Sequence, residues 1–376
     1  MHFKKLLLVL ILLCIISVGA SMAETKSRGK KKLLVVSSYN KEYIWTQETN
    51  KGFCDALLKL GYFDNEGQAA EYTKNDYVET PKVIVKKLWM DTKRKHGKEE
   101  LAKTTVEITK IVEKFKPDLI FVGDDNAANY IGNQFLDSKI PIVFWGVNIT
   151  PVKYGLVDSL NKPGHNITGV YQPGYIREGM KLLKTLVPKA ETFAIITDGS
   201  ETGRATYKAV EYLAQKGVLP LKHVETVSTS NFELWKKKAL ELQKKVDAFF
   251  VGHYASFQDK EGNYVTPEEA VRWYITHVTI PEVMTERQFV EQGILCTADD
   301  SGYKQGFEAV AIAHDILTNG AKPATYPPRA PQRGALVVNK QRAKMLGITL
   351  TPEMGIEEYI EEASVLKETK QYEEGR

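Results

Sequence analysis

Short apolar runs that end in polar residues or glycine alternate with longer segments of helical periodicity along most of the chain. The first runs are 33–36, 119–122 and 142–145, and a helical pattern occupies about 98–115. This alternation predicts βαβ units, in which parallel strands are joined by crossing helices. The fold class is therefore predicted to be α/β, with mostly parallel sheets.

A second set of similar units begins near residue 167, with strands expected at 193–196 and 248–251. The 376-residue chain is also longer than one hydrophobic core usually takes. Both observations predict two Rossmann-like lobes. We expect lobe 1 to comprise 32–167 and about 296–325, lobe 2 to comprise 168–295 and about 326–360, and 361–376 to form a polar tail.

The first 23 residues have the pattern of a secretory signal peptide. Lys4 and Lys5 give a basic start, an apolar run occupies residues 6–18, and small residues follow up to Ala23. The run is short for a membrane-spanning helix, and no later segment has the uncharged apolar length that such a helix needs. We expect cleavage after Ala23 and export of the product to the periplasm or the cell-surface space.

The charge balance and the cysteine positions limit which binding partners and metal sites the sequence predicts. The chain has 51 basic and 47 acidic residues, a near balance that gives no reason to expect nucleic acid or a membrane surface as partner. After the leader it keeps Cys54 and Cys296, which lack metal-ligand spacing. Free buried thiols are expected, with a disulfide as the alternative. We expect no metal and no cofactor.

Polar residues follow the expected strands, at the carboxyl edge where open α/β sheets bind ligands. After the first strand, Ser38, Tyr39 and Asn40 could present hydroxyl, amide and backbone N–H groups to an anion. The alternative is an ordinary helix N-cap. Tyr39 and Trp45 could form an aromatic wall, although core packing accounts equally well for Trp45.

An acidic pair ends another strand. Asp124 and Asp125 suit a ligand ammonium group or a hydroxyl-rich solute, and Asn126 could cap the following helix. A glycosidase mechanism is disfavoured, because neighbouring residues of a strand point to opposite faces. Asn148 follows the next strand and could pair with a ligand carboxylate or amide, or cap the turn before Pro151.

The second set of units adds candidates at its own strand ends. One strand-to-helix turn has glycines that permit close backbone approach, but it lacks the spacing and lysine of a phosphate-binding loop. At a later strand end, His253 lacks the nearby partner that metal binding would need. The candidates of this set are Asp198, Gly199, Ser200, Thr202, His253, Tyr254, Asp299 and Tyr303. Segment 90–94 mixes both charges and is expected to order a lobe edge by ion pairing or to project into the cleft.

Several blocks, in one order, resemble the ABC-transporter substrate-binding family related to tryptophan and tyrosine uptake. They include KPDLI at 116–120, IPIVF at 140–144, PGHNITGV at 163–170, TDGSET at 197–202 and GFEAV at 306–310. The resemblance implies a type I periplasmic-binding-protein fold, in which a multi-strand hinge joins two lobes around a cleft. Segments 37–40, 90–94 and 123–127 look instead like a branch that is also found as sensor ectodomains.

The resemblance implies an extracytoplasmic solute-binding protein of an ABC-type uptake system, not an enzyme. We expect it to act as a monomer, to capture a small molecule such as an amino acid or a related zwitterion, and to dock on an ABC permease. The alternative is a ligand-sensing module that docks on a sensor kinase or cyclase. An exported hydrolase is disfavoured, since the chain has no G-x-S-x-G motif and its histidines are scattered.

Overall fold

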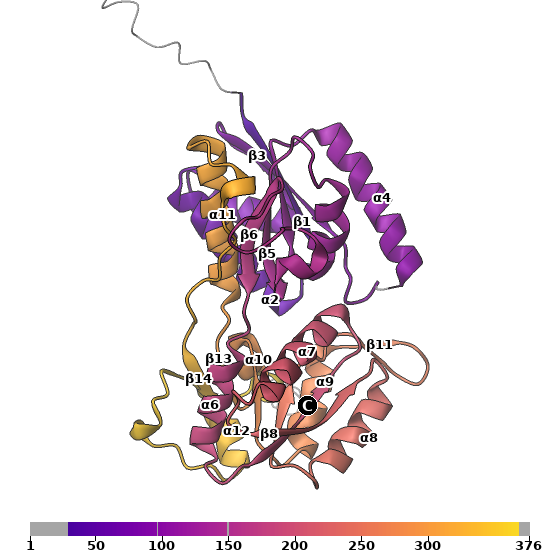
Figure 1. Ribbon diagram of the computed structural model, residues 1–376, viewed down its shortest axis with the longest axis vertical. Helices are drawn as coiled ribbons and strands as arrows, with labels where there is room; N and C mark the ends of the chain where they lie inside the picture. Colours follow the sequence, from indigo (N-terminus) through magenta and orange to yellow (C-terminus); the bar gives the residue numbers. More distant parts are fainter. Residues whose placement is uncertain (1–28, 96, 149, 368–376) are drawn as a thin grey trace, which may run out of the picture.

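Two lobes, each built around one sheet with helices on its faces, lie end to end along the long axis of the molecule (Figure 1). The computed structural model describes residues 29–95, 97–148 and 150–367. The predicted signal peptide, residues 1–23, lies outside them. The predicted α/β class is confirmed. None of the helices in the described ranges has the length and apolar character that crossing a membrane takes.

The lobe 1 sheet has the strand order β2-β3-β1-β4-β5-β6, in which β2 is antiparallel to β3 and the other neighbours are parallel. Its central strands are continuous apolar runs, as expected where both faces of a parallel sheet are covered. The strands are β1 (Lys31–Ser37), β2 (Tyr77–Glu79), β3 (Val83–Trp89), β4 (Leu119–Gly123), β5 (Ile142–Asn148) and β6 (Ile167–Gln172).

One helix pair of lobe 1 needs glycine on both partners. A Cβ atom on Gly52 would collide with the backbone of Tyr303, and one on Gly306 would collide with the carbonyl of Thr49. Helices α2 and α11 therefore approach closely enough to join the C-terminal half of the chain to lobe 1. The helices of this lobe are α2 (Ile44–Lys59), α3 (Glu66–Asn75), α4 (Lys98–Phe115), α5 (Asp124–Asn126), η1 (Ala127–Gly132), η2 (Pro151–Tyr154), α11 (Gly302–Thr318) and η3 (Pro323–Thr325).

The lobe 2 sheet has the order β15-β14-β13-β12-β9-β7-β8, in which β14 is antiparallel to β13 and the other neighbours are parallel. A separate antiparallel hairpin pairs β10 with β11. The strands are β7 (Thr192–Thr197), β8 (Lys222–Ser228), β9 (Ala248–Val251), β10 (Phe257–Gln258), β11 (Tyr264–Val265), β12 (Glu282–Met284), β13 (Cys296–Ala298), β14 (Leu336–Asn339) and β15 (Glu358–Ile360).

Helices cover both faces of the lobe 2 sheet and complete two apolar cores. One core is rich in aromatic rings, with Trp235 packed against Phe257 and Tyr274. The helices are α6 (Ile176–Leu186), α7 (Glu201–Gln215), α8 (Phe232–Leu242), α9 (Pro267–His277), α10 (Arg287–Gln292), α12 (Lys340–Met345) and η4 (Pro352–Met354).

Three segments connect the lobes, and two of them lie a few residues later than expected. Strand β6 pairs with β5 in lobe 1, so the first crossing follows Gln172 rather than residue 167. Strand β13 pairs with β12 in lobe 2, so the second crossing follows Ala298 rather than residue 295. The third connects η3 to β14. Backbone pairing decides these boundaries, whereas turn composition indicated only where the chain could bend.

Buried polar contacts tie the crossings together. The Asp300 carboxylate accepts a hydrogen bond from Gly174 N at 2.6 Å, which joins the second crossing to the first. Gln305 Nε2 donates to the Tyr171 carbonyl at 3.2 Å and to Asp300 at 3.4 Å. Arg329 of the third crossing exchanges backbone hydrogen bonds with the end of β6. These contacts link the three connecting segments into one hinge.

The predicted polar tail is in part a component of lobe 2. Ala363 and Val365 are buried in the same core as Trp235, and Gln341 accepts a hydrogen bond from Ala363 N at 2.7 Å. Two apolar side chains among charged neighbours carry too little periodicity to predict this packing. Residues 368–376 of the predicted tail lie outside the described residues.

An ion pair is buried within lobe 2. Arg342 donates to both carboxylate oxygens of Glu282, at 3.0 and 2.9 Å, and to the carbonyls of Ile275 and Val278, each at 2.9 Å. Both side chains are almost fully inaccessible, at 2% and 0%. Glu282 also accepts from Leu295 N, so the pair connects α9, α12 and the middle of the sheet.

We expect Arg342→Met to lower the free energy of unfolding by about 3–5 kcal/mol, because the Glu282 carboxylate would stay buried without its partner. Chemical denaturation followed by tryptophan fluorescence measures the change. Lys340→Met is the matched control, since its ion pair with Glu361 is exposed and should contribute less than about 1 kcal/mol. Equal losses in the two variants would contradict this account.

Candidate ligand-binding site

The strand ends of the two lobes face each other across a cleft that contains a small cavity. The empty space of this cavity, including the part that is open to solvent, is about 240 Å³. Its lining residues come from both lobes and are Tyr39, Tyr43, Trp45, Asp124, Asn148, Gln172, Thr202, His253, Glu286, Gln288 and Phe289. A second hollow, of about 680 Å³, borders this cavity. The two spaces adjoin at Tyr39 and Thr202, which line both of them.

Several buried polar atoms in this region have no hydrogen-bond partner within the described part of the chain. Two are carboxylate oxygens, Asp124 Oδ2 and Glu286 Oε2. Two are nitrogen donors, Lys93 Nζ and Gln288 Nε2, and His253 Nδ1 is a ring nitrogen. Most buried polar groups in proteins are paired. Unpaired buried atoms occur elsewhere in the described chain as well, but both of its unpaired carboxylate oxygens are in this region.

Asp124 is held in place by its backbone and by an aromatic partner. Its φ of 68° is left-handed, and Trp45 Nε1 donates to its Oδ1 at 2.6 Å. Gly146, with a φ of 64°, leaves space for the carboxylate, because a Cβ there would lie 2.5 Å from Asp124 Oδ1. Burial raises the pKa of Asp124 to about 8, aided by the charge of Asp125 and opposed by the Trp45 hydrogen bond.

Glu286 lies across the cavity at the N-cap of α10. Gln172 Nε2 donates to its Oε1 at 2.9 Å, while Oε2 is free. Burial raises the pKa of Glu286 to about 7. Nearby, burial lowers the pKa of His253 to about 3, so its ring is neutral at physiological pH. The cavity wall therefore combines two carboxyl groups with a neutral imidazole.

Lys93 places its ammonium group over two aromatic rings. Its Nζ lies 4.4 Å from the centre of the Tyr39 ring and 5.1 Å from that of Tyr43. The side chain is 2% exposed. Burial lowers the pKa of Lys93, and the carboxylates of Asp198 and Asp124 oppose that shift.

A hydrogen bond between Tyr39 and Thr202 joins the lobes across the cleft. The hydroxyl groups of Tyr39 in lobe 1 and Thr202 in α7 are 2.8 Å apart and both are buried. Tyr39 and Tyr43 also pack into an apolar cluster whose other members are mainly from lobe 2. These contacts require the lobes to be close together.

The structure brings some predicted site residues to these spaces. Those at the cavity are Tyr39, Trp45, Asp124, Asn148, Thr202 and His253. Asn126, Gly199 and Ser200 line the bordering hollow, and Asn126 donates to Thr92 at 2.9 Å. Asn40 lines a different surface hollow and donates to Glu42.

Other predicted residues support the loops. Ser38 Oγ accepts from Ala127 N at 2.7 Å, beyond the end of β4, and does not cap the helix that follows β1, whose N-cap is Tyr43. Asp125 accepts from Asn148 N, Asn148 Nδ2 and the Tyr154 hydroxyl, so both of its oxygens are paired. Asp198 likewise accepts from Ser200 and from Ala255 N.

The remaining three predicted residues also have structural contacts. Tyr254 donates to Gln292 within lobe 2. Asp299 accepts from Arg287 N at 3.0 Å beside the hinge. Tyr303 is on the first turn of α11 and stacks on Phe307, away from the cavity.

The predicted site residues do not include Tyr43, Gln172, Glu286, Gln288 and Phe289, and Lys93 is predicted only as part of segment 90–94, with projection into the cleft as one of two alternatives. Segment 90–94 was considered chiefly as a lobe edge, and Arg94 does pair there with Asp91 at 2.8 Å. Asp91 has a left-handed φ of 57°, and the neighbouring Lys93 side chain is buried instead of exposed. Glu286 follows a strand of three residues, which is too short to show a period.

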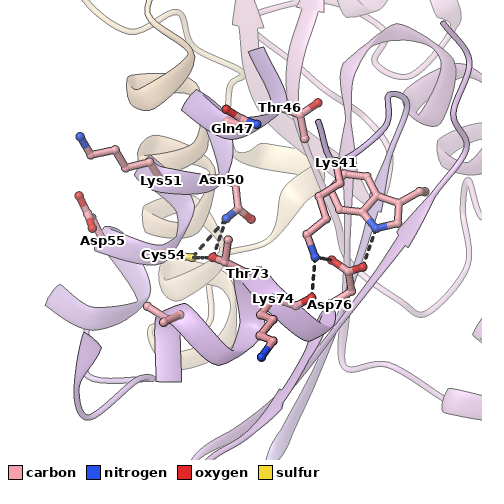
Figure 2. Close-up of a pocket in the computed structure, with 13 residues that line it drawn as sticks. Lys41, Thr46, Gln47, Asn50, Lys51, Cys54, Asp55, Thr73, Lys74 and Asp76 are labelled. Carbon is pink, nitrogen blue, oxygen red and sulfur yellow. Dashed lines mark hydrogen bonds and ion pairs between the residues drawn. The ribbon is translucent and has the colours of Figure 1, made fainter. Parts of the chain in front are cut away.

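A larger hollow lies elsewhere, on lobe 1 between α2, α3 and Trp89 (Figure 2). It measures about 1260 Å³ and is lined mainly by apolar surface. Some of its polar lining atoms are paired with each other: Asp76 accepts from Lys41 and Trp89, and Asn50 donates to Thr73 (Figure 2). Because one lobe supplies every lining residue, lobe closure cannot act on a molecule held there.

Comparisons with known proteins agree with the two-lobed fold. Residues 78–358 match the family model of ABC transporter substrate binding proteins. The chain belongs to this family. Its members are ligand-binding proteins rather than enzymes, and the predicted absence of enzymatic function agrees with this assignment.

Known relatives cover most of this substrate-binding protein. A tyrosine-binding protein of Clostridioides difficile (strain R20291) is 25% identical over 331 residues, which is 87% of this chain and 85% of the relative. The L-Trp complex of an ABC domain from Streptococcus pneumonia has a TM-score of 0.66 at 21% identity and covers 88% of this chain and 100% of its own. A conserved domain protein of Vibrio cholerae has a TM-score of 0.68 at 18% identity, with the same coverage. The predicted type I periplasmic-binding-protein fold is confirmed.

We expect Tyr39→Phe to shift the ligand-free protein toward a more open form, because it removes the hydroxyl that bonds to Thr202. One hydrogen bond contributes roughly 0.5–1.5 kcal/mol, so the open-to-closed ratio should rise roughly 2- to 10-fold. Small-angle scattering measures the radius of gyration. Tyr43→Phe is the matched control, and an identical change in both variants would count against the cross-lobe bond.

Proposed function

We propose that this protein is the extracytoplasmic receptor of an ABC-type uptake system and captures an amino acid or a related zwitterion between its lobes. The observation that carries the proposal is the pair of free carboxylate oxygens, Asp124 Oδ2 and Glu286 Oε2, on opposite sides of one buried cavity. Residues 1–23 would direct export of the chain, which would act as a monomer and present its ligand to a membrane permease.

An ammonium group is the ligand feature that suits these oxygens. It has three N–H donors and a positive charge, and it forms charge-assisted hydrogen bonds with carboxylates. Tyr43, Trp45 and Phe289 border the same cavity and offer apolar surface to the rest of the ligand.

The relatives support aromatic amino acids as the first compounds to test. One is called a tyrosine-binding protein and another was solved with L-Trp. In this chain the aromatic residues Tyr39, Tyr43 and Trp45 come from a single segment after β1. These rings could stack on the aromatic side chain of a bound amino acid, while Asp124 and Glu286 bind the ammonium group of the same ligand.

The two-lobed architecture supports capture by closure. A ligand that contacts both lobes binds the closed form more tightly and therefore shifts the population toward it. Asp124 on lobe 1 and Glu286 on lobe 2 would both reach the ligand only when the cleft is closed. The closed form would then be the one that the permease recognises.

We expect the mature protein to bind L-tyrosine or L-tryptophan in isothermal titration calorimetry, and Asp124→Asn to weaken binding roughly 10- to 100-fold. The amide keeps an acceptor for Trp45 but loses the negative charge opposite the ligand ammonium. Asp64→Asn, at an exposed position of lobe 1, is the matched control and should bind normally. Unchanged affinity of Asp124→Asn would contradict the proposed role of the acids.

We expect affinity for an ammonium-bearing ligand to rise as the pH increases from about 6 to about 8.5. In the free protein the raised pKa values of Glu286 and Asp124, about 7 and 8, keep both carboxyls largely protonated below those pH values. Binding of a cation favours their ionised forms, so it must release protons at low pH. Lys93 faces both acids, and the neutral His253 does not titrate in this range.

Calorimetry in two buffers of different ionisation enthalpy counts the released protons. Asp124→Asn should reduce both the proton release and the slope of affinity against pH. Affinity that is flat from pH 6 to 8.5 would contradict ionised carboxyls as the ammonium site.

A further inference from the structure

The two adjoining spaces in the cleft have opposite charge. The cavity has the carboxyls of Asp124 and Glu286 in its lining and no lysine or arginine. The bordering hollow is lined by Lys93, Lys98 and Arg204, with Glu201 as its one acid. Tyr39 and Thr202 are in both linings and therefore mark the boundary. Acidic residues thus line one space and mainly basic residues line the other.

Lys93 is the most deeply buried base of the hollow. Its ammonium group has three N–H donors and no hydrogen-bond acceptor among the described residues. The Tyr39 and Tyr43 rings provide cation–π attraction, which is weaker than hydrogen bonding to an anion. A buried ammonium group without an acceptor is costly.

Two of the acids that attract Lys93, Asp198 and Asp125, are already engaged by other groups. Asp198 accepts from Ser200 N, Ser200 Oγ and Ala255 N, which occupy both of its oxygens. Asp125 is similarly paired with Asn148 and Tyr154. Both attract Lys93 through their charge, but neither bonds to it. The Lys93 ammonium group therefore has no hydrogen-bond acceptor among the described residues, and a ligand carboxylate would supply one.

The start of α7 adds a second feature that favours an anion. Gly199, Ser200 and Thr202 line the hollow together with Lys93, and the first turn of this 15-residue helix carries positive partial charge. Arg204 lies one turn further and donates to the Gly199 carbonyl. Glu201 of the same turn interacts with Tyr154 and with Lys153 and Arg204.

We propose that Lys93 binds the ligand's carboxylate, so that the site selects amino acids over the amines that lack this group. The inference rests on the proposed function and specifies how the ligand lies. Its ammonium group faces Asp124 and Glu286, and its carboxylate faces Lys93 and the start of α7. Lys93 is therefore a specificity-determining residue of the cleft.

The test compares two matched pairs of compounds, L-tyrosine with tyramine and L-tryptophan with tryptamine, by calorimetry on the mature chain. We expect the wild-type protein to bind the amino acid of a pair roughly 10- to 100-fold more tightly than the amine, as one charged hydrogen-bonding contact provides. In Lys93→Met, amino acid binding should fall by the same factor while amine binding stays unchanged. Lys93→Arg should retain most of the preference.

Lys95→Met is the matched control, since Lys95 belongs to the same loop and is exposed beside Asp91. It should behave as wild type, and thermal unfolding of each variant checks that it folds. Equal loss of amine and amino acid binding in a folded Lys93→Met protein would overturn the inference and leave the proposed function standing. A wild-type protein that binds none of the four compounds would instead contradict the proposed amino acid ligand.

Discussion

Burial of charged groups without protein partners is the constraint on which the cleft depends. Asp124 and Glu286 each have one oxygen paired and one free, and Lys93 lies over two aromatic rings without an acceptor in the described ranges. Such burial is unfavourable, which is why the pKa values of the two acids are raised and that of the lysine is lowered. The closely packed apolar strands of both lobes provide the stability that holds these groups in place. A ligand with the complementary charges recovers the cost, and this links recognition to lobe closure.

The hinge and the cleft contain different kinds of contact. At the hinge, Asp300 and Gln305 bind backbone groups of the neighbouring crossings, so their partners belong to the connecting segments themselves. Across the cleft, Tyr39 meets Thr202 from the opposite lobe. In the proposed mechanism, opening of the lobes breaks the contact across the cleft and preserves the contacts at the hinge. This difference allows the lobes to move as bodies while the three crossings stay together.

Sequence patterns predicted several residues that line the cavity of the proposed site, because parallel strands place their carboxyl ends at one edge. Tyr39, Asp124 and Thr202 were predicted in this way, and all three line the cavity. The same rule could not find Glu286, since β12 has only three residues. It also could not separate residues that face the cavity from residues that brace a loop. Asp198 follows a strand as expected, yet backbone and hydroxyl donors occupy both of its oxygens.

The sequence by itself determined the α/β class, the two lobes and the family, because periodicity and motif order are local properties of the chain. Tertiary structure decided which lobe takes β6 and β13, since strands find their places by pairing with distant partners. It also decided which of the two neighbouring acids has a free oxygen. Asn148 and Tyr154 donate hydrogen bonds to the oxygens of Asp125, whereas Asp124, with its left-handed backbone, has one oxygen without a partner. The charge pattern of the cleft has the same origin. Its groups come from segments far apart in the chain, and only folding brings them within reach of one ligand.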